Sequence, residues 1–184
     1  TILGTSTDAI DLAEDRERFR NVMQKLGIPQ PASGMASNLP EAIAIAERIG
    51  YPLMVRPSYV LGGRGMEVVH DREDLTLYVT RAVDVSPDRP ILIDKFLEDA
   101  LELEADAISD GNEAYIPAIM EHIELAGIHS GDSACVLPPV SIPEKHLKTI
   151  EEYTRKIAIE LKVLGLINIQ YAIAGDRVYI HPGC

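Results

Sequence analysis

Two short apolar segments, residues 52–56 and 66–70, are joined by a glycine-rich connection. Gly62, Gly63 and Gly65 have no side chains, so the backbone N–H groups of this loop can turn toward an anion such as a phosphate. The pattern differs from a P-loop, because no helix is expected directly after it and it contains no Gly-Lys-Ser/Thr sequence. The spacing therefore indicates either a loop that covers a phosphate group or an ordinary mobile glycine loop.

Arg56 ends the first of these two apolar segments. Burying a guanidinium group costs much free energy unless the group meets an anion. That anion is either a phosphate of a bound ligand or one of the 29 acidic side chains of the chain itself. The residue type alone favours the acidic side chain.

A second group of polar residues lies where the apolar segment 91–94 ends. Its members of interest are Asp94, Lys95, Leu97 and Glu102. If this segment lies at a boundary between two lobes, these residues line a crevice of the kind that binds small molecules. From the residue types alone, a charged edge that is simply solvated is the default interpretation.

Polar residues gather again between residues 121 and 132. The side chains there that can bind a metal are Glu121, His122, Glu124 and His129. Their spacing matches neither a His-Glu-x-x-His helix nor a zinc finger. Three neighbours such as His129, Ser130 and Asp132 cannot easily adopt the linear geometry of a hydrolase triad. We therefore interpret this segment as a loop that hydrogen-bonds a polar ligand.

The composition narrows the class of protein. The 184 residues include 17 Lys and Arg against 29 Asp and Glu, a formal charge of −12, which argues against general binding of nucleic acid or anionic membranes. A local basic pocket for one nucleotide remains compatible with this charge. The chain has no apolar run long enough to span a membrane and no signal-peptide pattern, so we expect a cytoplasmic protein. Only Cys135 and Cys184 occur, which argues against a disulfide framework or a cysteine zinc site.

Periodicity predicts the elements that position these residues. Helices are expected over residues 15–26, 38–49 and 72–83, with Asn38 and Asp71 as caps. A fourth helix is expected to start at a capping box, Ser141 to Glu144, and to stop at Gly165. The expected strands are 52–56, 66–70, 91–94, 102–108, 115–123, 167–173 and 178–180. In the strand 167–173, alternation places Gln170 on the side away from an isoleucine-rich core.

These elements predict an α/β and α+β protein of two lobes. The polar, proline-rich stretch Pro87 to Pro90 is the expected boundary. We expect a linking helix over residues 1–26, a small mobile α/β lobe over residues 27–90, and a larger antiparallel-sheet lobe with helices over residues 91–184.

Four motifs, in order and spacing, closely resemble the large chain of carbamoyl phosphate synthetase. They are Arg56-Pro-Ser-Tyr-Val-Leu-Gly-Gly63, Met120-Glu-His-Ile-Glu124, Gly127-Ile-His-Ser-Gly-Asp-Ser-Ala-Cys135 and Asn168-Ile-Gln-Tyr-Ala172. The likeness covers almost the whole chain, and the second and third motifs look like the C-terminal half of that large chain, which phosphorylates carbamate. It implies an ATP-grasp fold, in which the nucleotide lies between a small lobe and a larger one.

The resemblance also implies roles for individual residues. Arg56 would contact the ATP phosphates, Gly62 and Gly63 would belong to the covering loop, and Glu102 would accept hydrogen bonds from the ribose. The residues implied along the adenine edge are Lys95, where the bacterial pattern has His, and Leu97. The segment implied to line the nucleotide pocket is Gly127, Ile128, His129 and Ser130. Gln170 would bind both metal and phosphate.

The resemblance further implies ATP with Mg²⁺ or Mn²⁺ as cofactors, and ADP and carbamate as further ligands. The partners that it implies are the remaining domains of the large chain and a glutaminase small subunit. The implied pathway leads to arginine or pyrimidines. Three alternatives stay open: the N-terminal half, which makes carboxyphosphate from bicarbonate; another ATP-grasp ligase of the biotin-dependent carboxylase type; and a non-catalytic nucleotide-binding or assembly module.

After residues 178–180 the family continues with Glu-x-Asn-Pro-Arg, whereas this chain reads His181-Pro-Gly-Cys184. Proline and cysteine cannot replace oxygen ligands of Mg²⁺, so we expect a truncated or altered fold with little turnover of its own.

Overall fold

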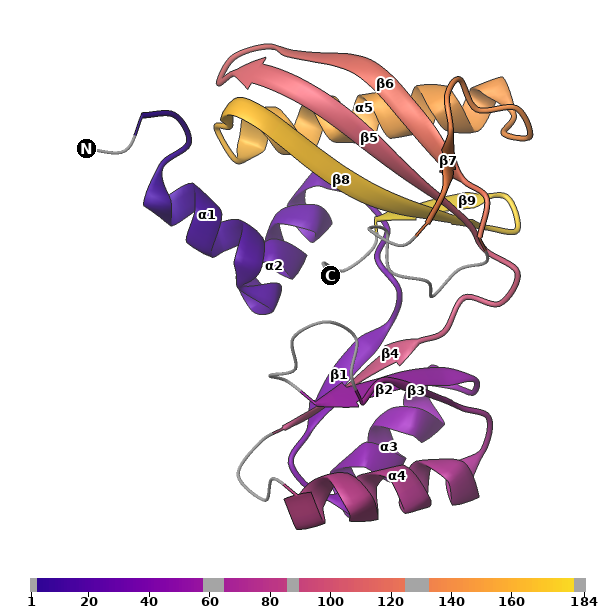
Figure 1. Cartoon of the computed structure of the whole chain (residues 1–184). Coiled ribbons are helices and arrows are strands. Elements are labelled where there is room, and N and C mark those ends of the chain that lie inside the picture. Colours follow the sequence, from indigo (N-terminus) through magenta and orange to yellow (C-terminus); the bar gives the residue numbers. More distant parts are fainter. Residues whose placement is uncertain (1–2, 58–64, 86–89, 125–132, 181–184) are drawn as a thin grey trace. The chain divides into compact units, whose positions relative to one another are not determined.

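The computed structural model describes residues 3–57, 65–85, 90–124 and 133–180, and it contains two compact units (Figure 1). The smaller unit comprises residues 31–97, and the larger unit comprises residues 1–30 and 98–184. This division differs from the expected one, because the strand after Pro90 pairs within the smaller unit and the N-terminal helices pack on the larger one.

The smaller unit is a four-stranded antiparallel sheet in the order β1-β4-β2-β3. The strands are β1 (Ser33–Ala36), β2 (Leu53–Pro57), β3 (Glu67–Val69) and β4 (Ile91–Lys95). Helices α3 (Leu39–Ile49) and α4 (Arg72–Val85) lie on one side of this sheet (Figure 1). Apolar side chains of β2, β4 and the two helices form its core, with Leu53, Val55 and Ile93 fully buried.

The expected caps of both helices are confirmed. Asn38 Oδ1 accepts a hydrogen bond from the Glu41 N–H, and Glu41 Oε2 accepts one from the Ser37 N–H. Asp71 Oδ1 accepts from the N–H groups of Glu73 and Asp74 at the start of α4. These side chains satisfy backbone donors that a helix start would otherwise leave without partners.

The larger unit is a five-stranded antiparallel sheet in the order β7-β6-β5-β8-β9. Its strands are β5 (Leu101–Asp110), β6 (Ala114–His122), β7 (Cys135–Val136), β8 (Leu164–Ala174) and β9 (Arg177–Ile180). Helix α5 (Glu144–Glu160) packs against one face, and its Ile150 and Ile157 join the core. The core is apolar because alternate residues of each strand point toward this helix.

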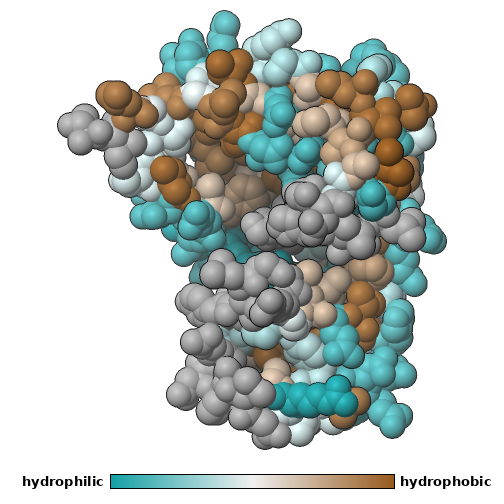
Figure 2. Space-filling view, in the orientation of Figure 1, coloured by the Kyte–Doolittle hydropathy of each residue, from teal (hydrophilic) through white to brown (hydrophobic). Residues whose placement is uncertain are grey.

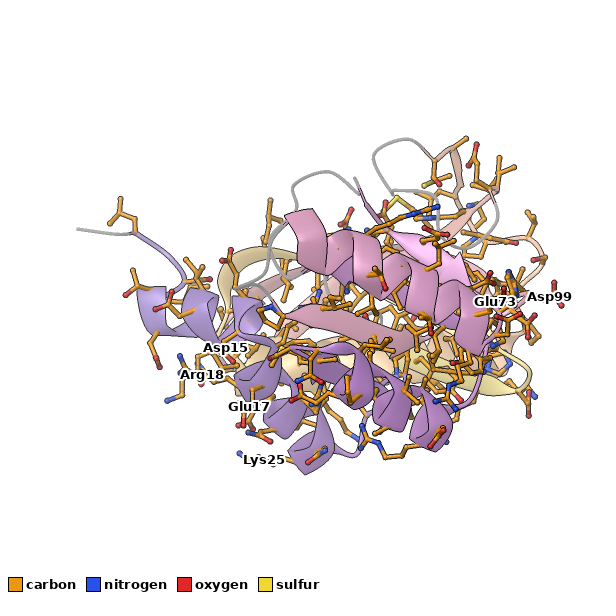
Figure 3. The ribbon with its side chains drawn as sticks, turned by 90° about the horizontal axis from the view of Figure 1, so that it is seen from below. Asp15, Glu17, Arg18, Lys25, Glu73 and Asp99 are labelled. Carbon is orange, nitrogen blue, oxygen red and sulfur yellow. The ribbon has the colours of Figure 1, made fainter. Side chains whose placement is uncertain are left out.

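Two helices precede the first sheet. Sequence periodicity predicts α2 (Arg16–Leu26) but not α1 (Thr7–Glu14), and the linking helix expected over residues 1–26 is two helices in the structure. Asp15 separates the two and caps α2, while Gly27 ends α2 in the left-handed conformation with a φ of 68°. In Figure 3, Asp15, Glu17 and Arg18 lie together at the start of α2, and Lys25 lies further along. An acidic start and a basic last turn suit the helix dipole.

The prediction for the helix after Ser141 is wrong at both ends. Pro143, not Ser141, is the residue before α5, and no side chain caps it, because the Ser141 hydroxyl donates to Glu121 instead. The helix stops at Glu160, and Leu164 and Gly165 belong to β8. Lys162, with a φ of 52°, turns the chain from the helix into the strand.

The surface of the described residues mixes both kinds of side chain. Figure 2 shows hydrophobic residues among hydrophilic ones on the visible face of each unit. The strand pair Ile108 and Leu166 is 49% and 83% exposed. Over the described residues, no helix has the length and apolar character that crossing a membrane requires.

Candidate functional site

The face of the larger sheet opposite α5 carries the polar residues. The register pairs Glu104 with Met120 and Gln170, and it pairs His122 with Cys135, so these side chains project from the same side of the sheet. We define the polar face as Glu102, Glu104, Asp106, His122, Cys135, Asn168 and Gln170. The intervening residues, such as Leu103 and Tyr171, are buried in the core. The predicted orientation of Gln170 is therefore confirmed.

Two of the expected ligand-binding residues come together on this face. Glu102 pairs with Ala172 in the β5–β8 ladder, and Glu104 pairs with Gln170, so Glu102 and Gln170 lie diagonally across adjacent strands. Both side chains are half-buried. Further along, Asn168 Nδ2 donates to Asp106 Oδ1 at 2.8 Å. The face thus offers carboxylate and amide oxygens to a ligand with hydroxyl groups or to a cation.

His122 lies at the centre of this acidic group. Its side chain is only 2% exposed, and among the described residues neither ring nitrogen has a hydrogen-bond partner. Glu102 Oε2 lies 3.7 Å from Nδ1, and Glu104 Oε2 lies 3.9 Å from Nε2. Both distances exceed those of an ordinary hydrogen bond.

Glu121, one residue earlier, points to the other face and is also buried. Its Oε2 accepts from the N–H groups of Val140 and Ser141 at 2.8 and 3.0 Å, and its Oε1 accepts from the Ser141 hydroxyl. Burial alone would raise the pKa of Glu121, but these three hydrogen bonds outweigh burial and lower the pKa. Glu121 therefore anchors the segment before α5 to β6 and is not a ligand-binding residue.

Arg56 lies in the smaller unit, on the face of β2 opposite its buried Val55. Its Nη2 donates to Asp94 Oδ2 on β4 at 3.3 Å, and the side chains are 14% and 9% exposed. The intramolecular carboxylate that residue type favours is therefore present. The Arg56 Nε is buried and, within the described part of the chain, has no hydrogen-bond partner.

The other predicted residues of the smaller unit lie at the end of β4 and beside the glycine-rich loop. Lys95 Nζ donates to the carbonyl oxygens of Tyr51 and Gly50 at 2.7 and 3.2 Å. Leu97, two residues later, is half-buried. Gly65 ends the loop with a φ of 81°, and its carbonyl oxygen accepts from the Tyr78 hydroxyl at 2.6 Å. Tyr78 thus fixes one end of the loop to α4.

Six of the predicted site residues lie outside the described residues: Gly62, Gly63, Gly127, Ile128, His129 and Ser130. The altered segment His181 to Cys184 also lies outside them. Sequence reasoning missed the contribution of Glu104 and Cys135. The period-two spacing from Glu102 could have indicated Glu104, but Cys135 joins the face only through the pairing of β7 with β6.

Comparison of the sequence with protein families matches residues 15–180 to the carbamoyl-phosphate synthase L chain, ATP binding domain. The chain is 63% identical over 179 residues to the carbamoyl phosphate synthase large chain of Archaeoglobus fulgidus. It is likewise 63% identical over 182 residues to that of Methanothermobacter thermautotrophicus. Each match covers 97% of this chain but only 17% of the relative's length.

Solved structures share the fold at lower identity. A biotin carboxylase–β-γ-ATP complex from Campylobacter jejuni has a TM-score of 0.79 and 22% identity, covering 96% of this chain and 41% of that one. D-alanyl-alanine synthetase A from Vibrio cholerae has a TM-score of 0.77 and 18% identity, covering 97% and 57%. The ATP-grasp fold expected from the sequence is confirmed. The chain belongs to the family of the ATP-binding domain of the carbamoyl phosphate synthase large chain.

Proposed function

We propose that this chain binds ATP for the phosphorylation of carbamate to carbamoyl phosphate. The family membership supports ATP binding, and the large-chain relatives of 55–63% identity support the ligase. Because the chain spans about 17% of their length, the complete reaction would need the rest of such a large chain and its glutaminase partner. The motifs of residues 120–124 and 127–135 favour the carbamate-phosphorylating half over the carboxyphosphate-forming half.

The observation that carries the proposal is the placement of Glu102 and Gln170 on one polar face. The Glu102 carboxylate can accept hydrogen bonds from two neighbouring hydroxyl groups, as a ribose presents them. Gln170, on the adjacent strand, offers an amide oxygen further along the same face. The residues proposed to continue this pocket are Gly127, Ile128, His129 and Ser130.

The smaller unit would recognise the rest of the nucleotide. Arg56 would donate to the phosphates through the part of its guanidinium that Asp94 does not use, and the backbone around Gly62 and Gly63 would cover them. Lys95 and Leu97 would lie along the adenine. Since the Lys95 ammonium is held by two backbone carbonyls, its position at the end of β4 is fixed before a ligand binds.

The donors on the polar face suit Mg²⁺, because Gln170 supplies a hard oxygen and a magnesium site in such enzymes is completed by phosphate oxygens and water. When bound, the metal would neutralise charge on the β- and γ-phosphates. Arg56 would stabilise the charge that moves onto the leaving ADP while a carbamate oxygen attacks the γ-phosphorus in line. The transfer needs no covalent enzyme intermediate, which agrees with a chain whose sequence shows no nucleophile motif.

Nucleotide titration of the chain and its Glu102→Gln variant tests the proposal. Losing hydrogen bonds to a charged acceptor costs about 1.5–3 kcal/mol, so we expect Glu102→Gln to weaken ADP binding roughly 10- to 150-fold. Glu151→Gln, an exposed change on α5, is the matched control and should bind as the unchanged chain does. Equal affinity in both variants would remove Glu102 from the nucleotide site. A chain that ignores ADP altogether would favour an assembly module.

A further inference from the structure

Three side chains of different chemistry meet beside His122. Glu104, His122 and Cys135 come from β5, β6 and β7, and one ligand atom from each lies within 4.8 Å of the others. His122 is almost completely buried, and both its ring nitrogens lack a hydrogen-bond partner among the described residues. A buried imidazole with two unused nitrogens is costly, so it points to a partner that binds between these groups.

We propose that Glu104, His122 and Cys135 form a binding site for a divalent transition metal of the zinc type. The inference goes beyond the proposed function and does not rest on it. His122 Nε2 faces Glu104 Oε2 at 3.9 Å, and Cys135 Sγ lies 3.9 Å from Glu104 Oε1. Tetrahedral zinc with bonds of about 2.0–2.3 Å holds its ligand atoms roughly 3.3–3.8 Å apart. The three candidate ligand atoms lie within 4.8 Å of one another, so the side chains would need to close by up to about 1 Å around a metal.

The donor set selects the class of metal. A thiolate, an imidazole and a carboxylate suit Zn²⁺ and its neighbours in the first transition row, whereas Mg²⁺ prefers oxygen donors only. Three protein ligands leave a fourth position for water. The carboxylates of Glu104 and Glu124 near Cys135 attract a cation.

Glu102 supplies the outer contact that zinc-bound histidines usually have. Its Oε2 lies 3.7 Å from His122 Nδ1, on the side of the ring away from Glu104. With zinc on Nε2, the Nδ1–H would donate to Glu102 and fix both the tautomer and the ring orientation. Spacing along the sequence could not indicate this site, because its three ligands lie on three strands and meet only through the β5–β6–β7 pairing.

The test is metal titration of the 184-residue chain. Zn²⁺ affinity is measured by competition with a chromophoric chelator, and Co²⁺ reports the ligands through its thiolate charge-transfer band and tetrahedral d–d bands. We expect Cys135→Ser to abolish the charge-transfer band and to weaken Zn²⁺ binding at least tenfold. Cys184→Ser, the matched control, should change neither. Glu102→Gln should weaken Zn²⁺ binding about 10- to 100-fold while the charge-transfer band persists.

The test also includes a variant of a second ligand, in case the substitution of the buried His122 prevents folding. If His122→Asn loses its native circular dichroism spectrum, Glu104→Gln takes its place, because Glu104 is only half-buried at the site. Either folded variant should lose the tetrahedral Co²⁺ spectrum. Equal Zn²⁺ affinity in the unchanged chain and Cys135→Ser, or a charge-transfer band lost in Cys184→Ser instead, would overturn the proposal.

Discussion

Glu121→Gln is the sharpest test of how the segment before α5 is anchored to β6. Glu121 is 7% exposed, and its carboxylate accepts two backbone hydrogen bonds and one hydroxyl hydrogen bond from Val140 and Ser141. Glutamine keeps the shape and, with its oxygen toward the backbone, can still satisfy the two N–H groups. The Ser141 hydroxyl can reverse and accept from the new amide. The substitution therefore removes the charge and little else.

The expected loss of stability follows from the three hydrogen bonds that Glu121 accepts. A hydrogen bond to a charged group contributes about 1.5–3 kcal/mol and a neutral one about 0.5–1.5, so each of the three loses about 1 kcal/mol. Because neighbouring bonds are not additive, we expect a loss of ~2–3 kcal/mol in the free energy of unfolding at pH 7. The hydrogen bonds lower the pKa of Glu121 below its unfolded value of 4.5. Its contribution is therefore fully present above that value and is lost as the pH falls through the lower, folded pKa.

Urea unfolding of both proteins at several pH values between 7 and 3 measures this effect. The difference in unfolding free energy should be largest at pH 7 and should shrink as the solution becomes more acidic than pH 4.5. Glu151→Gln on the exposed side of α5 is the control and should stay within about 0.5 kcal/mol of the unchanged chain. A difference below that size at pH 7, or one that does not vary with pH, would refute the role of the Glu121 charge.

Two further predictions concern the smaller unit. Tyr78→Phe removes the hydrogen bond to the Gly65 carbonyl and should lower the free energy of unfolding by about 1 kcal/mol at pH 7. Because burial raises the pKa of Tyr78 to about 12, the unchanged chain should lose stability as the pH rises from 10 toward 12. Urea unfolding at alkaline pH should show a weaker loss in the variant. Arg56→Lys keeps a cation beside Asp94 but loses the guanidinium fork. In a full-length large chain with this substitution, the rate of ADP release should fall roughly 100-fold while the fold is retained. An unchanged rate would remove Arg56 from the phosphate site.

The elements that sequence reasoning found are those with local signals. Asn38, Asp71 and Gly27 mark helix ends through side-chain or backbone properties that need no distant partner. β8 was found over residues 167–173, where the polar Asn168 and Gln170 alternate with apolar residues. Such signals come from neighbours along the chain, so they can be read before the fold is known.

The elements that sequence reasoning missed depend on contacts between residues far apart in the chain. β1 contains Gly34 and lacks β-branched residues; a Cβ at Gly34 would lie 2.8 Å from Ile45 Cγ2, so close packing of α3, not strand propensity, explains the glycine. Ser141 has the spacing of a capping residue, yet a buried carboxylate 20 residues earlier in the chain is the stronger acceptor for its hydroxyl. The predicted boundary at residues 87–90 differs from the observed one for the same reason, because the strands that pair with β4 can be identified only in the folded sheet.

The same contrast holds for the candidate site. Arg56 and Glu102 stand out by residue type and by resemblance to the family, and the structure adds the side chain that lies beside each, Asp94 and His122. No pattern along the chain could show that Glu104, His122 and Cys135 share one face. That juxtaposition depends on the register of three strands.

The distribution of charge supports the proposal that the phosphate contacts belong to the smaller unit. In residues 1–30 and 98–184, ten Lys and Arg stand against 20 Asp and Glu, a net charge of −10; in residues 31–97, seven stand against nine, a net charge of −2. An acidic sheet face repels a bare triphosphate but accepts hydrogen bonds from sugar hydroxyls and binds cations. A guanidinium held in place by Asp94 is the better group for the phosphates. In the proposed function, the larger unit would therefore bind the sugar and the metals, and the smaller unit the anion.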